Sequence, residues 1–390
     1  MNLSNNLFMK IDRIIPLSEV LNRKSVLLLG PRRTGKSYYL NNQLKVDRKY
    51  DLLDPETFRR LSSRPEIIRE ELTGKEKIIA IDEIQKIPSL MDLVHLLIEK
   101  NHVKFLLTGS SARKLNRSYT SLMAGRAKKM ILHPLVYPEL EKIKKVNINH
   151  ILQFGTLPIV QNSADPWDEL RDYTGLYLKE EILAESIVRK IENFSRFIDF
   201  AALTSGQVLN YESVASDAQV PARTIREYYS ILKDTLMGEV VLPVKATAKR
   251  KSTATGKFYF FDVGVVNSII GRKTITPKTI EYGFLFEHYI FNEVLAYRDY
   301  FNLDLKIEFW RIDQEHEVDL ILNEDIAIEI KATTLISEKH LKGLTQFASL
   351  GKCSRKIVVS LDKTYRKINN DVEVFPFDQF LSLLWNKKIA

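Results

Sequence analysis

The sequence predicts an α/β protein of several domains. Three observations support this prediction. A buried-type strand, "SVLLLG", runs into a glycine-rich loop and then into a helix. Helical segments follow, and one of them has the rhythm of a helix-turn-helix. Towards the carboxyl end, two apolar runs flank a short polar turn, which predicts a β-hairpin with charged residues on one face.

Composition limits the class of protein. The chain has 390 residues, 45% of them hydrophobic, which is enough for about two or three domains with cores of their own. No apolar run approaches the ~18 residues needed to cross a membrane, and the polar start "MNLSNNLFMK" is not a secretory signal. The only cysteine, Cys353, excludes an intramolecular disulfide and a cysteine-based metal site. We therefore expect a cytoplasmic protein with no membrane partner. The net charge of +9 favours an anionic partner.

The glycine-rich loop fits the P-loop pattern, in which a glycine and four residues precede Gly-Lys-Ser/Thr. Backbone N–H groups of such a loop surround phosphates, and the following helix directs its positive end at them. Lys36 would reach the β- and γ-phosphates of ATP, and Ser37 would hold Mg²⁺. The residues expected to bind the nucleotide are Gly30, Pro31, Arg32, Arg33, Thr34, Gly35, Lys36 and Ser37.

Two further strands would complete an ATP-hydrolysing site. The apolar strand "EKIIAIDEIQ" ends in Asp82 and Glu83. Asp82 is placed to coordinate the nucleotide's Mg²⁺ through water, and Glu83 to polarise the attacking water. A third strand, "KFLLTGSSAR", ends in the polar residues Thr108 and Ser110. We favour Ser110 as the sensor of the γ-phosphate, with Thr108 as the alternative.

Arg126, just ahead of the strand in "SLMAGRAKKMILHPL", has two interpretations. It could act as an arginine finger on a neighbouring subunit's nucleotide, which is worth about 10³ to 10⁵ in rate. Oligomerisation would then be part of catalysis, in a homo-oligomer such as a hexameric ring. It could also be an ordinary surface arginine, since only its position supports the catalytic role.

The segments "GPRRTGKS", "IIAIDEIQ", "LLTGSSAR", "SLMAGR" and "LHPLVYPEL" resemble the AAA+ ATPases of bacteria and archaea whose C-terminal part was long known only as a domain of unknown function. The resemblance continues through "GLYLKEEIL", "KFYFFDVGVVNSI", "GFLFEHYIFNEV" and "FWRIDQEHEVDLIL", so it covers nearly the whole chain. It implies an AAA+ core over residues 1–137 and a helical lid over 138–190. It further implies a winged helix-turn-helix over 191–272 and a restriction-endonuclease-like α/β domain over 273–390. It does not settle the substrate.

The expected lid is helical and is broken by "FGTLPIVQNSADPW". The family usually shows two glycines before the proline, whereas this chain has Gly155-Thr156-Leu157-Pro158, a departure that makes the loop stiffer. We expect this region to cover the nucleotide. Arg171 is one candidate for a sensor arginine.

The stretch "NYESVASDAQVPARTIREYYSILKDT" predicts a helix-turn-helix, with Ala215 at the helix crossing and Val220 filling the turn. Gln219 replaces the usual turn glycine. After it, "GEVVLPVKATAKRKSTATGKFYFFD" is typical of a two-stranded wing with a basic tip. A solvated hairpin beside a protein-interaction helix pair is the alternative. The residues expected to meet DNA phosphates are Arg223, Lys245, Lys249, Arg250, Lys251 and Lys257.

The hairpin is "VDLILNEDIAIEIKA", residues 318–332. If the turn is 323–325, Asp319 lies opposite Glu329, and alternation puts both on one face with Lys331. Two carboxylates across a ladder lie about 5 Å apart at Cβ, which costs stability. A bound metal explains this placement. The other face would hold the apolar side chains Val318, Leu320, Leu322, Ile326, Ile328 and Ile330.

The upstream segment "GFLFEHYIFNEVLAY" predicts an amphipathic helix. Phe284, Phe291 and Leu295 recur at helical spacing and would form its core stripe. Glu287 could point from this helix towards the hairpin.

The order of these residues is that of the PD-(D/E)xK nucleases: Glu287 on a helix, Asp319 on a strand, then Glu329-x-Lys331. Asp319 and Glu329, with help from Glu287, would bind Mg²⁺ or Mn²⁺, which generates a hydroxide nucleophile near the scissile phosphate. Lys331 would orient or deprotonate that water. Gln346, on the next helix, matches a glutamine of the nucleases that work beside motors. Alternatively, the charges form a solvated ion pair of ~0.5 kcal/mol.

Three functions remain open. The first is an oligomeric ATP-hydrolysing motor or switch that binds single-stranded, duplex or branched DNA and cuts it in DNA processing or repair. The second is an ATP-dependent regulatory module that binds DNA or protein through a non-cutting nuclease fold. The third is a protein remodeller, which usually needs an aromatic-bearing loop in the ATPase core, and no clear one lies between Ala80 and Gly109.

Overall fold

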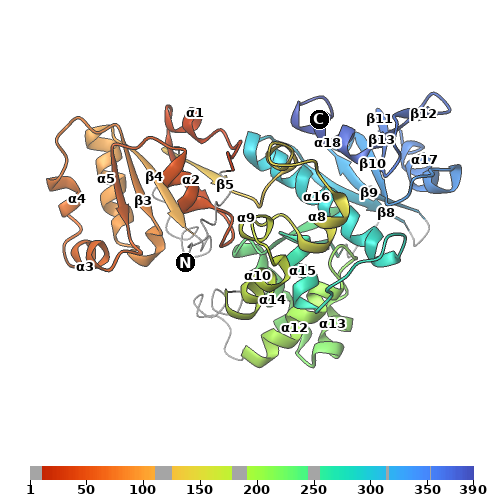
Figure 1. The fold of residues 1–390 in the computed structure, drawn as a ribbon, viewed down its shortest axis with the longest axis horizontal. Helices are drawn as coiled ribbons and strands as arrows, with labels where there is room; N and C mark the ends of the chain where they lie inside the picture. Colours follow the sequence, from red (N-terminus) through yellow and green to blue (C-terminus); the bar gives the residue numbers. More distant parts are fainter. Residues whose placement is uncertain (1–10, 110–124, 178–190, 245–254, 313–315, 352) are drawn as a thin grey trace, which may run out of the picture.

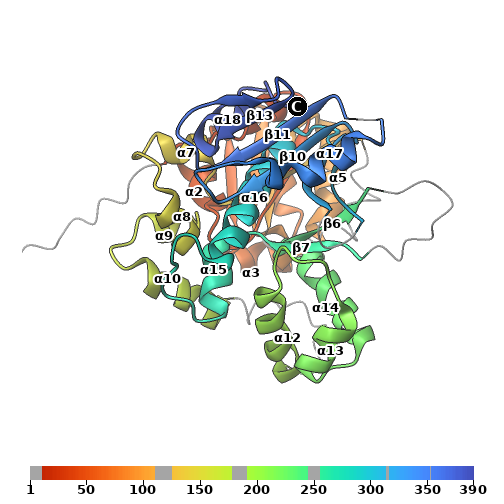
Figure 2. The same ribbon diagram turned by 90° about the vertical axis from the view of Figure 1, so that its right-hand side faces the viewer.

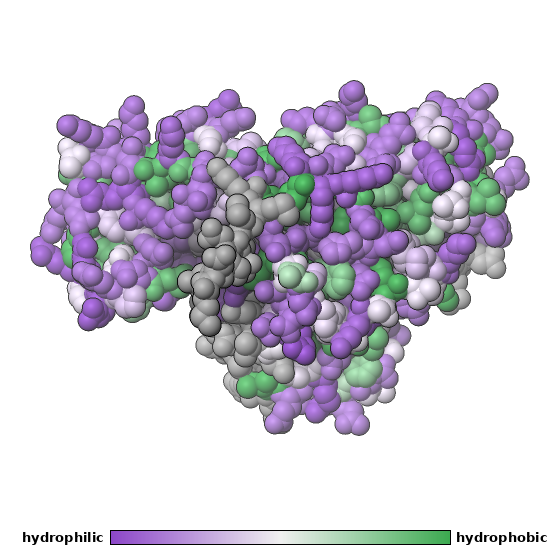
Figure 3. Space-filling view, viewed as in Figure 1, coloured by the Kyte–Doolittle hydropathy of each residue, from purple (hydrophilic) through white to green (hydrophobic). Residues whose placement is uncertain are grey.

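The computed structural model describes residues 11–109, 125–177, 191–244, 255–312, 316–351 and 353–390. Two β-sheets organise these residues, a five-stranded sheet in the N-terminal part and an eight-stranded sheet in the C-terminal part. Figure 1 shows the two sheets side by side, with the long helix α16 between them and the helices of the middle of the chain below. The face in Figure 3 is predominantly hydrophilic, with apolar residues in small scattered areas.

The N-terminal sheet is parallel throughout and has the strand order β2-β3-β4-β1-β5. Alternate residues of β1 enter two hydrophobic clusters: Leu27 and Leu29 pack towards α5, and Val26 and Leu28 towards α2. Burial on both faces is typical of parallel sheets, and the expected α/β core is present. The strands are β1 Ser25–Leu29, β2 Arg48–Asp51, β3 Ile78–Asp82, β4 Lys104–Gly109 and β5 Ala127–Ile131. The helices are α1 Leu17–Leu21, α2 Lys36–Asn42, α3 Pro55–Ser63, α4 Ile67–Glu70, η1 Ile84–Lys86 and α5 Leu90–Asn101.

The middle of the chain is helical, as expected. The predicted helix pair forms as α13 and α14, and Gln219 between them adopts the left-handed conformation (φ 52°) that glycine usually supplies. Val220 is buried at this turn. Together with α12, the pair projects away from both sheets (Figure 2). The elements are α7 Tyr137–Glu141, α8 Ile148–Phe154, α9 Pro158–Gln161, α10 Pro166–Asp172, the π-helix η2 Tyr173–Tyr177, α12 Ile191–Leu203, α13 Tyr211–Ala218, α14 Ala222–Asp234 and α15 Val263–Ile269.

The C-terminal sheet has the order β12-β13-β11-β10-β9-β8-β6-β7. The sequence predicts β6 and β7 as a separate wing, but the two strands form one edge of this sheet. They join it because Leu242 and Pro243 of β6 pair with β8, while β7 pairs with β6. Residues on both sides of the expected boundary at 272–273 thus belong to one sheet. Its strands are β6 Gly238–Pro243, β7 Lys257–Phe260, β8 Ile307–Arg311, β9 Glu317–Leu322, β10 Ile326–Lys331, β11 Arg355–Ser360, β12 Arg366–Ile368 and β13 Val372–Pro376. The helices after β7 and α15 are α16 Ile280–Phe301, η3 Glu338–Leu341, α17 Lys342–Ala348 and α18 Phe377–Trp385.

The predicted hairpin is confirmed in position and register. The strands β9 and β10 are antiparallel, with Ile328 opposite Leu320, so the next pair is Glu329 and Asp319. The backbone N–H of Ile330 donates to Asp319 Oδ2 at 2.7 Å. In the turn, Asn323 and Glu324 have left-handed φ values of 52° and 61°, as tight hairpin turns require.

Helix α16 differs from the amphipathic helix that its sequence predicts. It is buried on nearly all sides because β5, α8, α18 and β10 pack around it. Phe291 and Leu295 lie in the core as expected, but Phe284 is 39% exposed. Among the described residues, no helix combines the length and apolar character that crossing a membrane requires.

Arg13 connects the two halves of the molecule. Its guanidinium is buried and donates from Nε to Glu139 Oε2 at 2.9 Å. One terminal nitrogen donates to the carbonyl of Thr34 at 2.5 Å, and the other to the Tyr300 hydroxyl at 2.7 Å. Thr34 lies in the glycine-rich loop and Tyr300 near the end of α16, so one side chain joins the N-terminal domain to the C-terminal domain.

Gly155 ends α8 where that helix meets α15. Its φ is 71°, and a Cβ placed there would lie 1.9 Å from Oδ1 of Asp262. Asp262 accepts from the N–H of Thr156 at 2.7 Å and from the N–H of Val265 at 3.1 Å. Burial raises the pKa of Asp262 to about 6. Glycine is therefore required here by both backbone conformation and space.

We predict that Gly155→Ala lowers the free energy of unfolding by about 2–4 kcal/mol. Two costs add: an alanine is strained at a positive φ, and its Cβ would clash with the carboxylate of Asp262. Gly271→Ala is the matched control: its φ is 68°, but no atom lies within 4 Å of the added Cβ. It should cost only about 1 kcal/mol. Urea unfolding followed by circular dichroism measures both, and equal losses would show that the contact with Asp262 is unimportant.

Candidate nucleotide site and carboxylate pocket

The glycine-rich loop is positioned by β1 and α2, as its sequence predicts. Arg33 and Gly35 have positive φ values of 64° and 93°, which curl the backbone. Gly30 has no room for a side chain, since a Cβ would lie 2.4 Å from the carbonyl oxygen of Leu132. The ammonium of Lys36 is buried and donates to the carbonyl oxygens of Gly30 at 2.7 Å and Pro31 at 2.9 Å. The loop thus encircles the lysine expected to reach the phosphates.

The acidic end of β3 lies at the same sheet edge, because β1, β3 and β4 are parallel neighbours in the order β3-β4-β1. Asp82 is fully buried and accepts from the hydroxyl of Thr108 through Oδ1. Its Oδ2 is also buried and has no hydrogen-bond partner among the described residues. An unpaired buried carboxylate oxygen is costly and fits the coordination sphere of a hydrated Mg²⁺. Ser37, on the first turn of α2, is the second residue suited to that ion.

Glu83 adopts a left-handed conformation (φ 58°, ψ 46°), which is unusual for a residue other than glycine. Its N–H donates to Thr108 Oγ1 at 3.2 Å, and its carboxylate accepts from the side-chain amide of Gln85. Such strain commonly occurs at functional sites. Gln85, which the sequence analysis missed, holds the carboxylate of the expected catalytic glutamate.

The remaining residues expected around the nucleotide have different surroundings. Ser110 lies outside the described residues, whereas Thr108, the alternative sensor, contacts both acidic residues. Arg126 is 39% exposed at the side chain and pairs with Glu99. Arg171 is exposed and pairs with Asp168 on its own helix. An arginine finger acts on a neighbouring subunit, so this role of Arg126 stays a prediction.

An apolar cavity of about 410 Å³ adjoins the glycine-rich loop. No local pattern in the sequence predicts it. Pro158, from the "GTLP" loop, and the half-exposed ring of Tyr38 form part of its wall. Only folding brings its residues together, although Pro158, the first residue of α9, was a local signal. The lining residues are Ile11, Arg13, Arg33, Gly35, Tyr38, Leu135, Pro158, Ile159 and Asn162.

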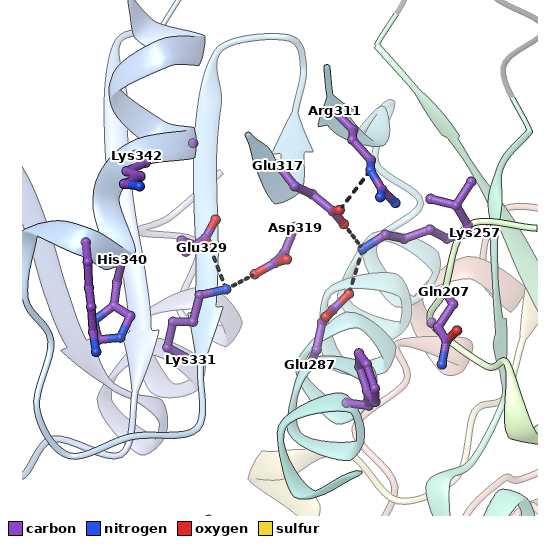
Figure 4. Close-up of a pocket in the computed structure, with 15 residues that line it drawn as sticks. Gln207, Lys257, Glu287, Arg311, Glu317, Asp319, Glu329, Lys331, His340 and Lys342 are labelled. Atoms are coloured by element: carbon purple, nitrogen blue, oxygen red, sulfur yellow. Dashed lines mark hydrogen bonds and ion pairs between the residues drawn. The ribbon is translucent and has the colours of Figure 1, made fainter. Parts of the chain in front are cut away.

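The C-terminal pocket has a volume of about 520 Å³ and contains the charged face of the hairpin (Figure 4). Lys331 Nζ lies 2.5 Å from Glu329 Oε1 and 3.5 Å from Asp319 Oδ2. Glu329 Oε2 is buried without a hydrogen-bond partner in the described part of the chain. Burial and the charge of Asp319 raise the pKa of Glu329 to about 8, although Lys331 opposes the shift. The lining residues are Gly206, Gln207, Val208, Lys257, Phe284, Glu287, Arg311, Glu317, Asp319, Glu329, Lys331, Lys339, His340, Lys342 and Gly343.

A second lysine enters this pocket from β7. Lys257 Nζ lies 3.0 Å from Glu287 Oε1 and 2.5 Å from Glu317 Oε1, and only 4% of its side chain is exposed. Glu287 Oε1 also accepts from the Tyr259 hydroxyl at 2.6 Å. The expectation that Lys257 faces DNA phosphates from a wing is therefore wrong. Because β7 is an edge of the C-terminal sheet, this side chain points into the pocket.

The three expected metal ligands are not gathered around one point. Figure 4 shows Glu287 bridged to Glu317 by Lys257, while Asp319 and Glu329 share Lys331. No group of three acidic, histidine or cysteine side chains in the described ranges is arranged to hold a metal ion. As it stands, the pocket does not fit a divalent cation bound by Glu287, Asp319 and Glu329 together.

Gln346 and the basic tip were also expected near DNA. Gln346 is exposed and is absent from the pocket lining. Its helix packs Gly343 closely on β9, where a Cβ would lie 1.9 Å from the carbonyl oxygen of Glu317, and this orientation turns Gln346 to solvent. Arg223 is 92% exposed on α14 and pairs with Glu227. The tip residues Lys245, Lys249, Arg250 and Lys251 lie outside the described residues.

Comparison with known proteins divides the chain into three segments. Residues 22–141 match the family model of an AAA domain. Residues 147–276 and 282–380 match models of two domains of unknown function, DUF8612 and DUF4143. The first match covers the parallel sheet, the glycine-rich loop and the acidic end of β3. The chain therefore contains an AAA-type ATPase domain, which implies ATP binding with Mg²⁺.

Relatives of similar length occur in distant organisms. An uncharacterized protein of Mycobacterium tuberculosis is 23% identical over 386 residues, which cover 95% of this chain and 84% of the relative. One of Haemophilus influenzae is 24% identical and covers 79% of this chain and 83% of the relative. An uncharacterized protein of Methanocaldococcus jannaschii is 23% identical over an alignment that covers 94% of this chain and 90% of the relative. The similarity to the mycobacterial and archaeal relatives thus extends over nearly the whole of this chain.

We predict that Lys36→Ala lowers ATP turnover at least about 100-fold, because the mutation removes the cation that we expect to face the transferred phosphate. Release of inorganic phosphate measures turnover, and circular dichroism verifies the fold. Lys75→Ala, at an exposed position of the same domain, controls for the loss of one positive charge. Normal turnover by Lys36→Ala would refute the assignment of the nucleotide site.

Proposed function

We propose that this protein is an oligomeric ATP-hydrolysing machine, a motor or switch, that binds DNA and cuts phosphodiester bonds in its C-terminal pocket. One observation supports the cutting step best. Asp319, Glu329 and Lys331 converge from one hairpin, and Glu287 enters the same pocket from α16. Buried acidic groups beside lysines, gathered in one cavity, are typical of functional sites.

On the nucleotide side, Lys36 faces the phosphates, and Ser37 and Asp82 hold Mg²⁺. The ion would supply positive charge to the phosphate oxygens. Glu83 orients the attacking water, and Gln85 positions its carboxylate. The apolar cavity beside the loop accepts the base of the nucleotide, since its volume and lining suit a flat ring. Arg126 completes the site of a neighbouring subunit, which makes the homo-oligomer the active form.

On the DNA side, the pocket wall carries basic side chains besides the two lysines that pair with the hairpin and helix carboxylates. Arg311, Lys339 and Lys342 provide cations for the phosphodiester backbone. Phe284 exposes part of its ring at the same pocket, where a base of a single strand can stack. Lys331 orients the water that attacks the scissile phosphate. We assign DNA contacts to Arg223 and to the basic tip at 245–251.

A second candidate function has an observation of its own. Lys257 and Lys331 each pair with two carboxylates of the pocket, so these acidic groups have cationic partners within the chain itself. Such a pocket is compatible with an ATP-dependent regulatory module that binds DNA or protein without cutting. Nuclease folds can persist as binding domains, so the fold alone does not decide between the two candidates.

A cleavage assay on single-stranded, linear, supercoiled and branched DNA separates these candidates. We predict that the wild type cuts at least one substrate with Mg²⁺ or Mn²⁺. Glu329→Ala and Lys331→Ala should each lower the rate at least about 100-fold. Glu338→Ala, at an exposed position outside the pocket lining, is the matched control and should retain activity.

If the wild type binds DNA in a salt-sensitive manner but cuts none of the substrates, the regulatory module is the correct function. Cutting that survives in Glu329→Ala and Lys331→Ala would assign the activity to another site or to a contaminant. Comparison of the cleavage rates with and without ATP then shows whether the nucleotide drives cutting or restrains it.

A further inference from the structure

A groove of about 740 Å³ lies where the ATPase domain meets the C-terminal domain. Its lining shares no residue with the C-terminal pocket or with the apolar cavity beside the glycine-rich loop. We propose that this groove binds the phosphodiester backbone of DNA through Arg23, Lys24, Lys128 and Lys387. The inference rests on the DNA binding proposed above, and it adds a contact that the proposed function does not include.

The four cations come from three segments that are distant in the sequence. Arg23 and Lys24 lie in the turn between α1 and β1, and Lys128 lies on β5. Lys387 follows α18, and its Nζ lies 4.2 Å from the centroid of the Phe301 ring, which also lines the groove. Cations from both domains therefore line one groove, so an anion bound there would contact both domains.

None of these four cations forms an ion pair with another residue in the described part of the chain. Exposed arginines elsewhere in the ATPase domain differ, since Arg64 pairs with Glu70 and Arg69 with Glu66. Among the described residues that line the groove, four cations stand against one carboxylate, Glu19, which leaves a net charge of +3. Like charges gathered in a concave surface raise the local positive potential, which favours an anionic ligand.

Lys128 has a second explanation that the other three cations lack. Strand β5 is an edge of the parallel sheet, and a lysine on an edge strand discourages pairing with another chain. Arg23, Lys24 and Lys387 lie outside the strands of this sheet. Protection of an edge thus accounts for one of the four cations, whereas an anionic ligand accounts for all of them.

Charge density favours DNA over an acidic protein segment as this ligand. Duplex DNA carries one negative charge per about 1.7 Å of helix axis. An extended peptide advances about 3.3 Å per residue, so even an all-acidic peptide carries only about half that density. A peptide that adds as a strand also needs an open strand edge, and helix α16 already packs against β5. The groove therefore gains most from binding DNA.

DNA binding by the nucleotide-free full chain tests this inference, measured by the fluorescence anisotropy of a labelled duplex over a range of salt concentrations. The groove variant removes one cation from each segment through Arg23→Gln, Lys128→Gln and Lys387→Gln. Each phosphate contact contributes about 0.9 to the slope of log affinity against log salt. We predict a slope smaller by about 2–3 and an affinity at least about tenfold lower. Each single variant should lower the slope by about one.

The matched control carries Lys75→Gln, Lys144→Gln and Lys363→Gln. These changes remove the same charge at exposed positions outside the groove. The control should keep the slope of the wild type and lose less than about threefold in affinity, because salt screens distant exposed charges. Circular dichroism verifies the fold of both triple variants.

If the groove variant binds DNA like the control, the groove is not a DNA contact, while the DNA binding of the proposed function stands. If the wild type itself shows no salt-sensitive binding of DNA, the proposed function fails and this inference fails with it. A labelled polyglutamate peptide should bind the wild type at least about tenfold more weakly than a duplex of equal charge. Equal binding that is lost in the groove variant would assign the groove to an acidic protein and overturn the proposal.

Discussion

The buried guanidinium of Arg13 is the interaction on which the arrangement of the two halves depends. It holds the carbonyl of Thr34 in the glycine-rich loop, the carboxylate of Glu139 and the hydroxyl of Tyr300 on α16. Loss of one partner would leave a buried charge unpaired, which typically costs about 3–5 kcal/mol. The nucleotide site and the C-terminal domain are therefore parts of one packed body rather than independent modules on a linker.

Helix α16 extends this connection to the C-terminal pocket. Tyr300 contacts Arg13, and Glu287 on the same helix contacts Lys257 in the pocket. At 1.5 Å per residue, these two positions are about 20 Å apart along the helix axis. Between them, Glu293 accepts from the N–H of Tyr137 and from the indole of Trp385, both at 2.8 Å. Buried polar contacts thus fix the helix at several points, and a shift at one end would reach the other.

Local patterns in the sequence predicted the parts of both sites that lie on single elements. The P-loop, the acidic end of β3 and the register of the hairpin follow from short-range spacing, because period-2 alternation and a glycine-rich turn fix neighbouring side chains. Where a feature depends on pairing between distant segments, the sequence-based prediction either missed the feature or was wrong. Lys257 enters the pocket because β6 pairs with β8, and Gln346 faces solvent because Gly343 packs on β9. The apolar cavity likewise requires four separate segments of the chain.

In the proposed function, ATP hydrolysis at the nucleotide site and cutting in the C-terminal pocket serve the same bound DNA. The most direct test is steady-state ATP hydrolysis by the wild type with and without DNA, over a range of salt concentrations. We expect DNA to raise the rate of ATP hydrolysis severalfold, and this stimulation to fall steeply with salt, because phosphate contacts release counterions. An ATP turnover that is the same with and without DNA would contradict it.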